Sequence, residues 1–278
     1  MDLRIHKSDI KESLADDRLK SESSAFRVSL TLKKYGEYMK YLAMLLLIIC
    51  SPLSLTVNAE EPNWSKFQAN FYFTCPLAPD CVEAYGDLMA APEIADKKFE
   101  AALYSMAHNG MDDATHVMRF YFKDAAEYMK AGQTFSTSPA MAEFLASGRE
   151  AGNEPQYQTL TTHTIAEGDP LGNKAALRWS INVSDPATFV PAWTKMAAEL
   201  AEKPWGGKAY GLQTYYLGSL GTVTHEIWVG FDSPVEALTF LDEFPKTAEW
   251  QSYSVDVADA VSIVRSYMQL TAISLNED

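Results

Sequence analysis

The chain has 278 residues, with 23 Lys and Arg against 37 Asp and Glu, and its formal net charge is −14 at pH 7. An acidic surface repels phosphate backbones and anionic lipids, so we expect no nucleic-acid partner. The length allows one large domain or two small ones.

The first 59 residues are typical of targeting sequence rather than of a folded domain. Residues 1–38 are polar and mixed in charge, and we interpret them as an extension upstream of a natural start at Met39, with a cytoplasmic extension as the alternative. Residues 39–59 have the pattern of a signal peptide: lysines precede the apolar run Tyr41–Cys50, and small residues at Val57 and Ala59 predict cleavage before Glu60.

An uncleaved membrane anchor is the alternative for residues 39–59. However, Ser51 and Pro52 interrupt the apolar stretch, which is short for a membrane span. We therefore predict an exported, periplasmic protein that is free of the membrane after cleavage.

Two cysteines follow the predicted cleavage site, in the segment CPLAPDC. Nearby cysteines in an exported protein usually pair, so we predict a structural disulfide between Cys75 and Cys81. A redox or metal pair is the alternative, but the spacing is not CxxC and no third ligand is close in sequence. We predict no metal site.

The second half of the chain repeats the first. Residues 115–122 (THVMRFYF) match residues 224–231 (THEIWVGF) at an offset of 109, and an offset of 108 pairs Phe71 with Trp179 and Tyr85 with Trp193. Two copies of one unit predict a pseudo-symmetric body. We assign the first copy to residues 60–168 and the second to residues 174–278, with a hinge at residues 169–173.

The predicted elements run in the same order in both copies. In the first copy they are a strand at 67–75, a helix at 79–89 with Asp80 as N-cap, strands at 99–106 and 116–122, a helix after Asp124, a helix at 139–148 and a strand at 157–165. In the second copy they are a strand at 176–183, a helix to 202, strands at 210–217 and 225–231, helices after Ser233 and at 248–254, a helical pattern at 256–264 and a strand at 266–274.

The order β-α-β-β-α-β is that of the ferredoxin-like unit. We predict an α+β fold in which two tandem ferredoxin-like repeats pack their antiparallel sheets into one intramolecular α/β-barrel. With the recurring Thr-His at the start of the third strand (Thr115-His116 and Thr224-His225), the chain resembles the dimeric α/β-barrel superfamily, which includes antibiotic-biosynthesis-monooxygenase-like and EthD-like domains. The resemblance covers about residues 67–274. Some members bind haem and others oxidise aromatic substrates without a cofactor. We predict no cofactor here, and haem binding is left open.

Strand alternation separates an apolar face from a mixed one. The apolar face should pack under the helices, and the mixed face should line a space between the two sheets. The mixed face supplies the candidate ligand-binding residues, which could orient a planar or acidic ligand: Tyr72, Arg119, Tyr121, Arg178, Asn182 and Trp228. The alternative is that these groups satisfy one another in a closed core without a ligand.

Two histidines, His116 and His225, are secondary candidates for a base or a ligand. Each lies at a strand start in phase with apolar residues, which favours a hydrogen-bonded structural role. The sequence therefore predicts a small-molecule-binding protein for an apolar or aromatic ligand, with a cavity between the repeats. A cofactor-independent monooxygenase-like enzyme and a non-catalytic structural or partner-binding module are the alternatives, and the catalytic residues and oligomeric state are not assigned.

Overall fold

The computed structural model describes residues 65–96, 100–110 and 112–275. The predicted N-terminal extension and signal peptide, residues 1–38 and 39–59, lie outside the described residues. Among the described residues, none of the helices has both the length and the hydrophobicity of a membrane span.

The elements of the two repeats follow the predicted order. The first repeat contains β1 (Phe67–Thr74), α2 (Ala78–Ala90), α3 (Pro92–Ala95), β2 (Glu100–Ala107), β3 (His116–Phe122), α4 (Ala125–Thr137), α5 (Pro139–Glu150) and β4 (Glu154–Glu167). The second contains β5 (Ala175–Val183), α6 (Pro186–Ala201), β6 (Ala209–Leu217), β7 (His225–Phe231), α7 (Pro234–Glu243), the 3₁₀ turn η1 (Phe244–Lys246), α8 (Ala248–Asp256) and β8 (Val261–Leu275).

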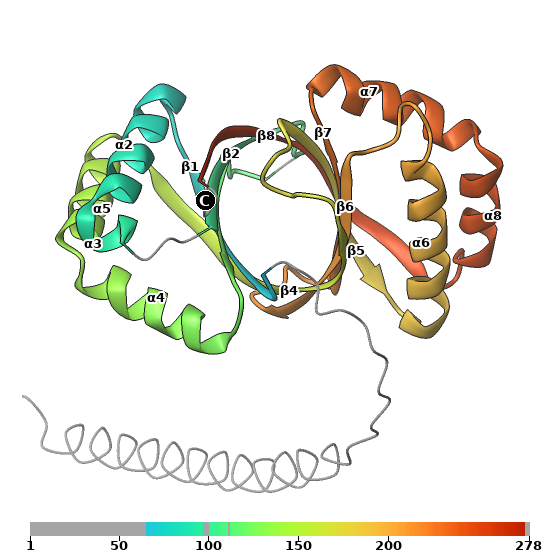
Figure 1. The fold of residues 1–278 in the computed structure, drawn as a ribbon, viewed down its shortest axis with the longest axis horizontal. Helices are drawn as coiled ribbons and strands as arrows, with labels where there is room; N and C mark the ends of the chain where they lie inside the picture. The colour runs from blue at the N-terminus through green and yellow to red at the C-terminus, as the bar shows by residue number, and fades with distance from the viewer. Residues whose placement is uncertain (1–64, 97–99, 111, 276–278) are drawn as a thin grey trace, which may run out of the picture. The chain divides into compact units, whose positions relative to one another are not determined.

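All neighbouring strands are antiparallel, and they close into one barrel in the order β1-β3-β2-β8-β5-β7-β6-β4. The long strands β4 and β8 each pair with both repeats: β4 joins β1 to β6, and β8 joins β5 to β2. Helices α2 to α5 cover the barrel on one side and α6 to α8 on the opposite side (Figure 1). The predicted fold, two ferredoxin-like repeats closed into an intramolecular barrel, is confirmed.

The repeat also recurs in the helix starts. Asp124 accepts a hydrogen bond from the backbone N–H of Glu127 at 2.8 Å, and Ser233 accepts one from Glu236 at 3.2 Å. Glu127 and Glu236 in turn accept a hydrogen bond from the backbone N–H of the residue before the cap, Lys123 and Asp232. The side chains of cap and glutamate thus bond backbone N–H groups that the helix itself leaves without a partner. In contrast, Asp80 lies in the first turn of α2 rather than at its N-cap, which is Leu77.

The Thr-His motif ties the first strand of each repeat to the third. The Thr115 hydroxyl accepts from the backbone N–H of Cys75 at 2.8 Å and lies 2.9 Å from Nδ1 of His116. In the second repeat, the Thr224 hydroxyl accepts from the N–H of Val183 at 2.9 Å and lies 2.9 Å from Nδ1 of His225. The motif therefore has a structural use at the same place in both repeats.

Two further predictions concern single segments. The disulfide between Cys75 and Cys81 is present, and it closes the turn between β1 and α2. The helical pattern predicted over residues 256–264 is wrong: α8 ends at Asp256 and β8 begins at Val261. Pairing decides this segment, because Val261 and Ile263 align with Val183 and Ile181 of β5.

Candidate functional site

The mixed strand face lies inside the barrel, as the alternation predicted. Tyr72, Arg119, Tyr121, Arg178 and Trp228 all point there and are at most 3% exposed. Asn182 is half-buried near the end of β5, outside the cluster that the other five form.

A buried ion cluster joins the two repeats across the barrel interior. Arg178 donates a hydrogen bond to the Glu226 carboxylate, and Nη2 of Arg119 lies 4.0 Å from the same carboxylate oxygen. Arg119 also donates to the Tyr267 hydroxyl at 3.2 Å, and Tyr267 donates to the second oxygen of Glu226 at 3.1 Å. Tyr215 donates to that oxygen as well, at 3.3 Å.

The charges of this cluster are fixed by their surroundings. Burial alone would raise the pKa of the Glu226 carboxyl, but Arg178 and Arg119 outweigh it, so its pKa is lowered and it stays ionised. Burial, together with the same two arginines, lowers the pKa of His163 to about 3, so this imidazole is neutral at pH 7.

The sheet interior is also filled by tyrosine and glutamine side chains. Tyr72 stacks on Tyr157 with ring centroids 4.3 Å apart, and Nε2 of Gln213 donates to Oε1 of Gln68 at 2.8 Å. The side chains predicted to line a cavity between the repeats thus contact one another and their neighbours. The apolar pocket described next lies on another face of the sheet than these predicted residues.

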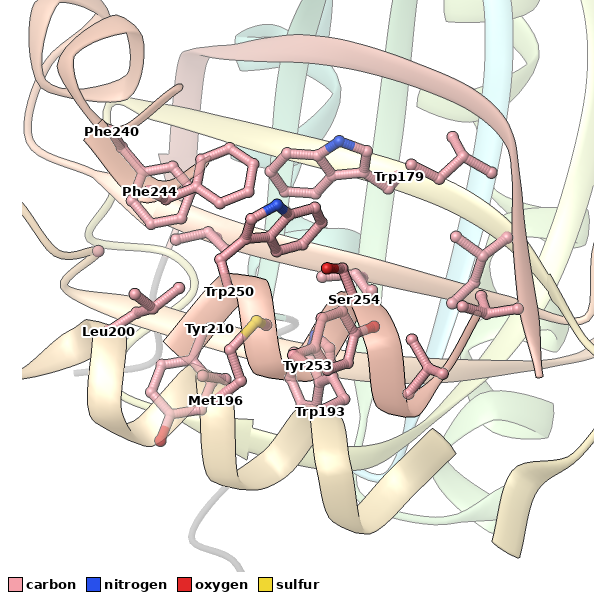
Figure 2. A pocket seen from close by; sticks show the side chains of 18 of the residues that line it. Trp179, Trp193, Met196, Leu200, Tyr210, Phe240, Phe244, Trp250, Tyr253 and Ser254 are labelled. Atoms are coloured by element: carbon pink, nitrogen blue, oxygen red, sulfur yellow. The ribbon is translucent and has the colours of Figure 1, made fainter. Parts of the chain in front are cut away.

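That pocket lies on the outer face of the sheet of the second repeat, beneath α6, α7 and α8 (Figure 2). Its volume is about 320 Å³. The walls are largely aromatic, and the rings come from strands and helices together: Trp179, Trp193, Tyr210, Phe240, Phe244, Trp250 and Tyr253.

One wall is a continuous row of rings. Phe240 and Phe244 stack with centroids 4.9 Å apart, Phe244 meets Trp250 edge-on at 4.7 Å, and Trp250 lies 5.5 Å from Tyr253. Figure 2 shows Trp250 of α8 and Trp179 of β5 extending toward the same space. Such a wall offers aromatic faces and edges for contact with a planar apolar molecule.

The pocket opens to solvent between α8 and the start of β8. Ser254, Ala258 and Ile263 line it and are exposed, Ile263 by 62%. The Ser254 hydroxyl donates to the backbone carbonyl of Gln251 at 2.9 Å, which leaves its oxygen able to accept a hydrogen bond from a ligand.

No charged side chain and no histidine is found among the described residues that line the pocket. Haem would need an axial ligand and cationic partners for its propionates, and the described lining offers Met196 and tyrosines but no cation. The pocket residues therefore do not fit haem, and they favour a neutral, apolar ligand.

The two secondary histidines, His116 and His225, lie at the starts of β3 and β7, away from this pocket. Burial lowers the pKa of both imidazoles, and each is held by the preceding threonine. The structure brings neither together with a second acid–base residue in the pocket.

The comparisons with known proteins agree with the fold. No family model matches the chain, and no curated protein matches its sequence. Among solved structures, the chain is similar to a proposed monooxygenase of Fusobacterium nucleatum subsp. nucleatum, with a TM-score of 0.54 and 11% identity over 77% of this chain and 95% of that one.

Two further structures are similar at lower scores. An anthrone oxidase-like protein has a TM-score of 0.48 and 13% identity over 76% of this chain and 92% of that one. A proposed monooxygenase of Lactobacillus acidophilus has a TM-score of 0.48 and 12% identity over 77% of this chain and 97% of that one. At these identities the likeness concerns the fold alone: this chain has the dimeric α/β-barrel fold, with both repeats in one chain.

Proposed function

We propose that the protein is a binding protein for a small, neutral, aromatic or apolar molecule, which it holds in the pocket beneath α6, α7 and α8. The observation that carries this proposal is the pocket itself: about 320 Å³ with seven aromatic residues in its wall and an open mouth. Ligand pockets commonly have volumes of about 300–1,000 Å³, so the ligand has the size of a few fused rings at most.

Binding is favoured over catalysis by the composition of the wall. General acid–base chemistry needs a titratable group within hydrogen-bond reach of the substrate, commonly His, Asp, Glu or Lys. The described lining residues include none of these four types. A cofactor-independent monooxygenase of similar fold is the alternative, and oxygen consumption with a bound aromatic substrate distinguishes the two.

We test the proposal with N-phenyl-1-naphthylamine, an uncharged aromatic probe whose fluorescence rises in an apolar site. The purified wild-type protein is expected to bind the probe in a saturable way. The variant Ala258→Trp places a large ring at the mouth of the pocket, where Ala258 is exposed, and should weaken binding at least about tenfold, or 1.4 kcal/mol.

The matched control is Ala146→Trp, which adds the same ring at an exposed position of α5 in the other repeat. This variant should bind the probe like wild type. Equal affinity in all three proteins would place the probe elsewhere and contradict the proposal. Native mass spectrometry of freshly purified protein then tests whether a ligand of the host is retained.

We also propose that the protein is exported to an oxidising compartment. The supporting observations are the signal-peptide pattern of residues 39–59 and the disulfide between Cys75 and Cys81, since disulfides persist mainly outside the cytoplasm. Cell fractionation and intact mass should give a periplasmic protein that begins at Glu60. A cytoplasmic protein with two free thiols would contradict this proposal.

A further inference from the structure

The barrel interior contains two arginines that share one carboxylate. Arg119 is fully buried and Arg178 is 3% exposed, and both guanidinium groups lie within 4.0 Å of one oxygen of Glu226. Arg265, a further arginine of the described interior, already has its own carboxylate in Asp112 and a further partner in Tyr157. The central group therefore has one more positive than negative charge.

Several N–H donors of these arginines have no acceptor. Nε and Nη1 of Arg119 and Nε of Arg178 are buried and have no hydrogen-bond partner within the described part of the chain. A guanidinium carries five N–H donors and is always charged, so burying it without acceptors is unfavourable. Arg119 has one further contact, since its guanidinium carbon lies 5.4 Å from the centre of the Tyr104 ring. A neutral ring does not balance the positive charge of the guanidinium.

Three buried tyrosines near the arginines do not supply the missing negative charge. Burial raises the pKa of the Tyr72, Tyr104 and Tyr215 hydroxyls well above the ordinary value, so these phenols stay neutral. His163 is neutral as well. The excess charge and the open donors point in the same direction, toward an acceptor that is not among the described residues.

We propose that the interior of the barrel binds a small monovalent anion, a halide or a carboxylate group, between the guanidinium groups of Arg119 and Arg178. Such an anion accepts the open N–H donors and balances the second arginine. The site is separate from the apolar pocket, because Arg178 and Trp179 are consecutive on β5 and point to opposite faces of the sheet. Its occupancy therefore does not depend on the proposed ligand of the pocket.

The first experiment measures thermal unfolding of the wild-type protein in sodium gluconate, formate, chloride and bromide at matched ionic strength. Gluconate is much larger than formate or a halide ion and serves as the reference. Formate or a halide should raise the melting temperature in a saturable way, by about 2–4 °C when the anion is at roughly five times its dissociation constant. A larger effect of formate than of halides assigns the site to carboxylates, and the reverse order assigns it to halides.

The variant Arg119→Met removes one arginine of the site and should lose the saturable rise. The control Arg149→Met removes an exposed arginine of α5, so it makes the same change in total charge and should keep the full rise. Identical melting temperatures of the wild type in all four salts would overturn the proposal. So would a folded Arg119→Met variant that keeps the anion effect.

Diffraction gives a second measurement, which does not require the variant to fold. Wild-type crystals soaked in bromide should show an anomalous peak within about 3.5 Å of the Arg119 and Arg178 guanidinium groups. An ordered water at that place, with no anomalous peak, would overturn the halide form of the proposal. A formate soak that shows an ordered water and no formate density at that place would overturn the carboxylate form.

Discussion

Replacing Glu226 by glutamine tests whether the barrel interior is held together by charge. The Glu226 carboxylate is 2% exposed, accepts from Arg178, Tyr215 and Tyr267, and lies 4.0 Å from Arg119. Glutamine keeps the shape but leaves both arginines buried without a counter-charge. Breaking a buried pair in this way costs on the order of 3–5 kcal/mol, which is a large part of the stability of an ordinary domain.

The assay is equilibrium unfolding in urea, carried out in gluconate so that no small anion replaces the carboxylate. The free energy of unfolding should fall by the amount given, at an unchanged dependence on urea concentration. The control is Glu249→Gln, which breaks the pair with Lys203 at 2.6 Å; both partners of that pair are partly exposed, so the loss should be far smaller. Equal losses in the two variants would refute the reasoning.

Three further predictions follow from single contacts. Replacing Cys75 and Cys81 by serine should lower the free energy of unfolding by about 2 kcal/mol, since the disulfide closes a short loop, and a reducing agent should give the wild type the same loss. Thr247 is the N-cap of α8, and its hydroxyl accepts a hydrogen bond from the N–H of Trp250 at 3.2 Å. Thr247→Ala should lower the free energy of unfolding by about 1 kcal/mol and weaken probe binding. Unchanged binding would contradict a role of α8 in the pocket. Burial lowers the pKa of His163 from 6.5 to about 3. Between these pH values the unfolded chain binds a proton that the folded chain does not. The free energy of unfolding therefore falls as the pH falls, by at most ~1.4 kcal/mol per pH unit. His163→Gln should flatten the urea-derived stability between pH 6.5 and pH 5, and a parallel decline in both proteins would contradict this assignment.

The fold could be predicted from the sequence because the repeat is visible in register. The offset of 109 that aligns Thr115-His116 with Thr224-His225 aligns β3 with β7, whose bounds match the prediction at both ends. Alternation along these strands then separated the helix-covered face from the barrel interior. The failure at residues 256–264 has a local cause: Val257, Val261 and Val264 fit a helical period. Pairing with β5 makes the segment from Val261 onward a strand instead.

The pocket could not be located in this way. Its wall consists of aromatic and aliphatic side chains on the faces that pack under the helices, so its residues carry the same signal as an ordinary core. In the sequence, Trp179 and Trp193 pair with Phe71 and Tyr85 of the other repeat and carry no sign of a pocket. The pocket of about 320 Å³ exists because of how the rings of α8 and η1 pack above the sheet. Such packing cannot be deduced from a pattern of residues in the sequence.

Joining two repeats in one chain permits an interior that two identical subunits could not have. In a symmetric pair each charge occurs twice, at equivalent places. Here, the partner of Glu226 in the other repeat is Val117, the partner of Arg119 is Trp228, and the partner of Arg178 is Asn70. The ion cluster consequently crosses from one repeat to the other, with Arg119 of the first reaching Glu226 and Tyr267 of the second. Because Glu226 is the one carboxylate among the described residues that lies within 4.0 Å of the two arginines, this asymmetry links the repeats. It also leaves open the N–H donors that we propose an anion accepts.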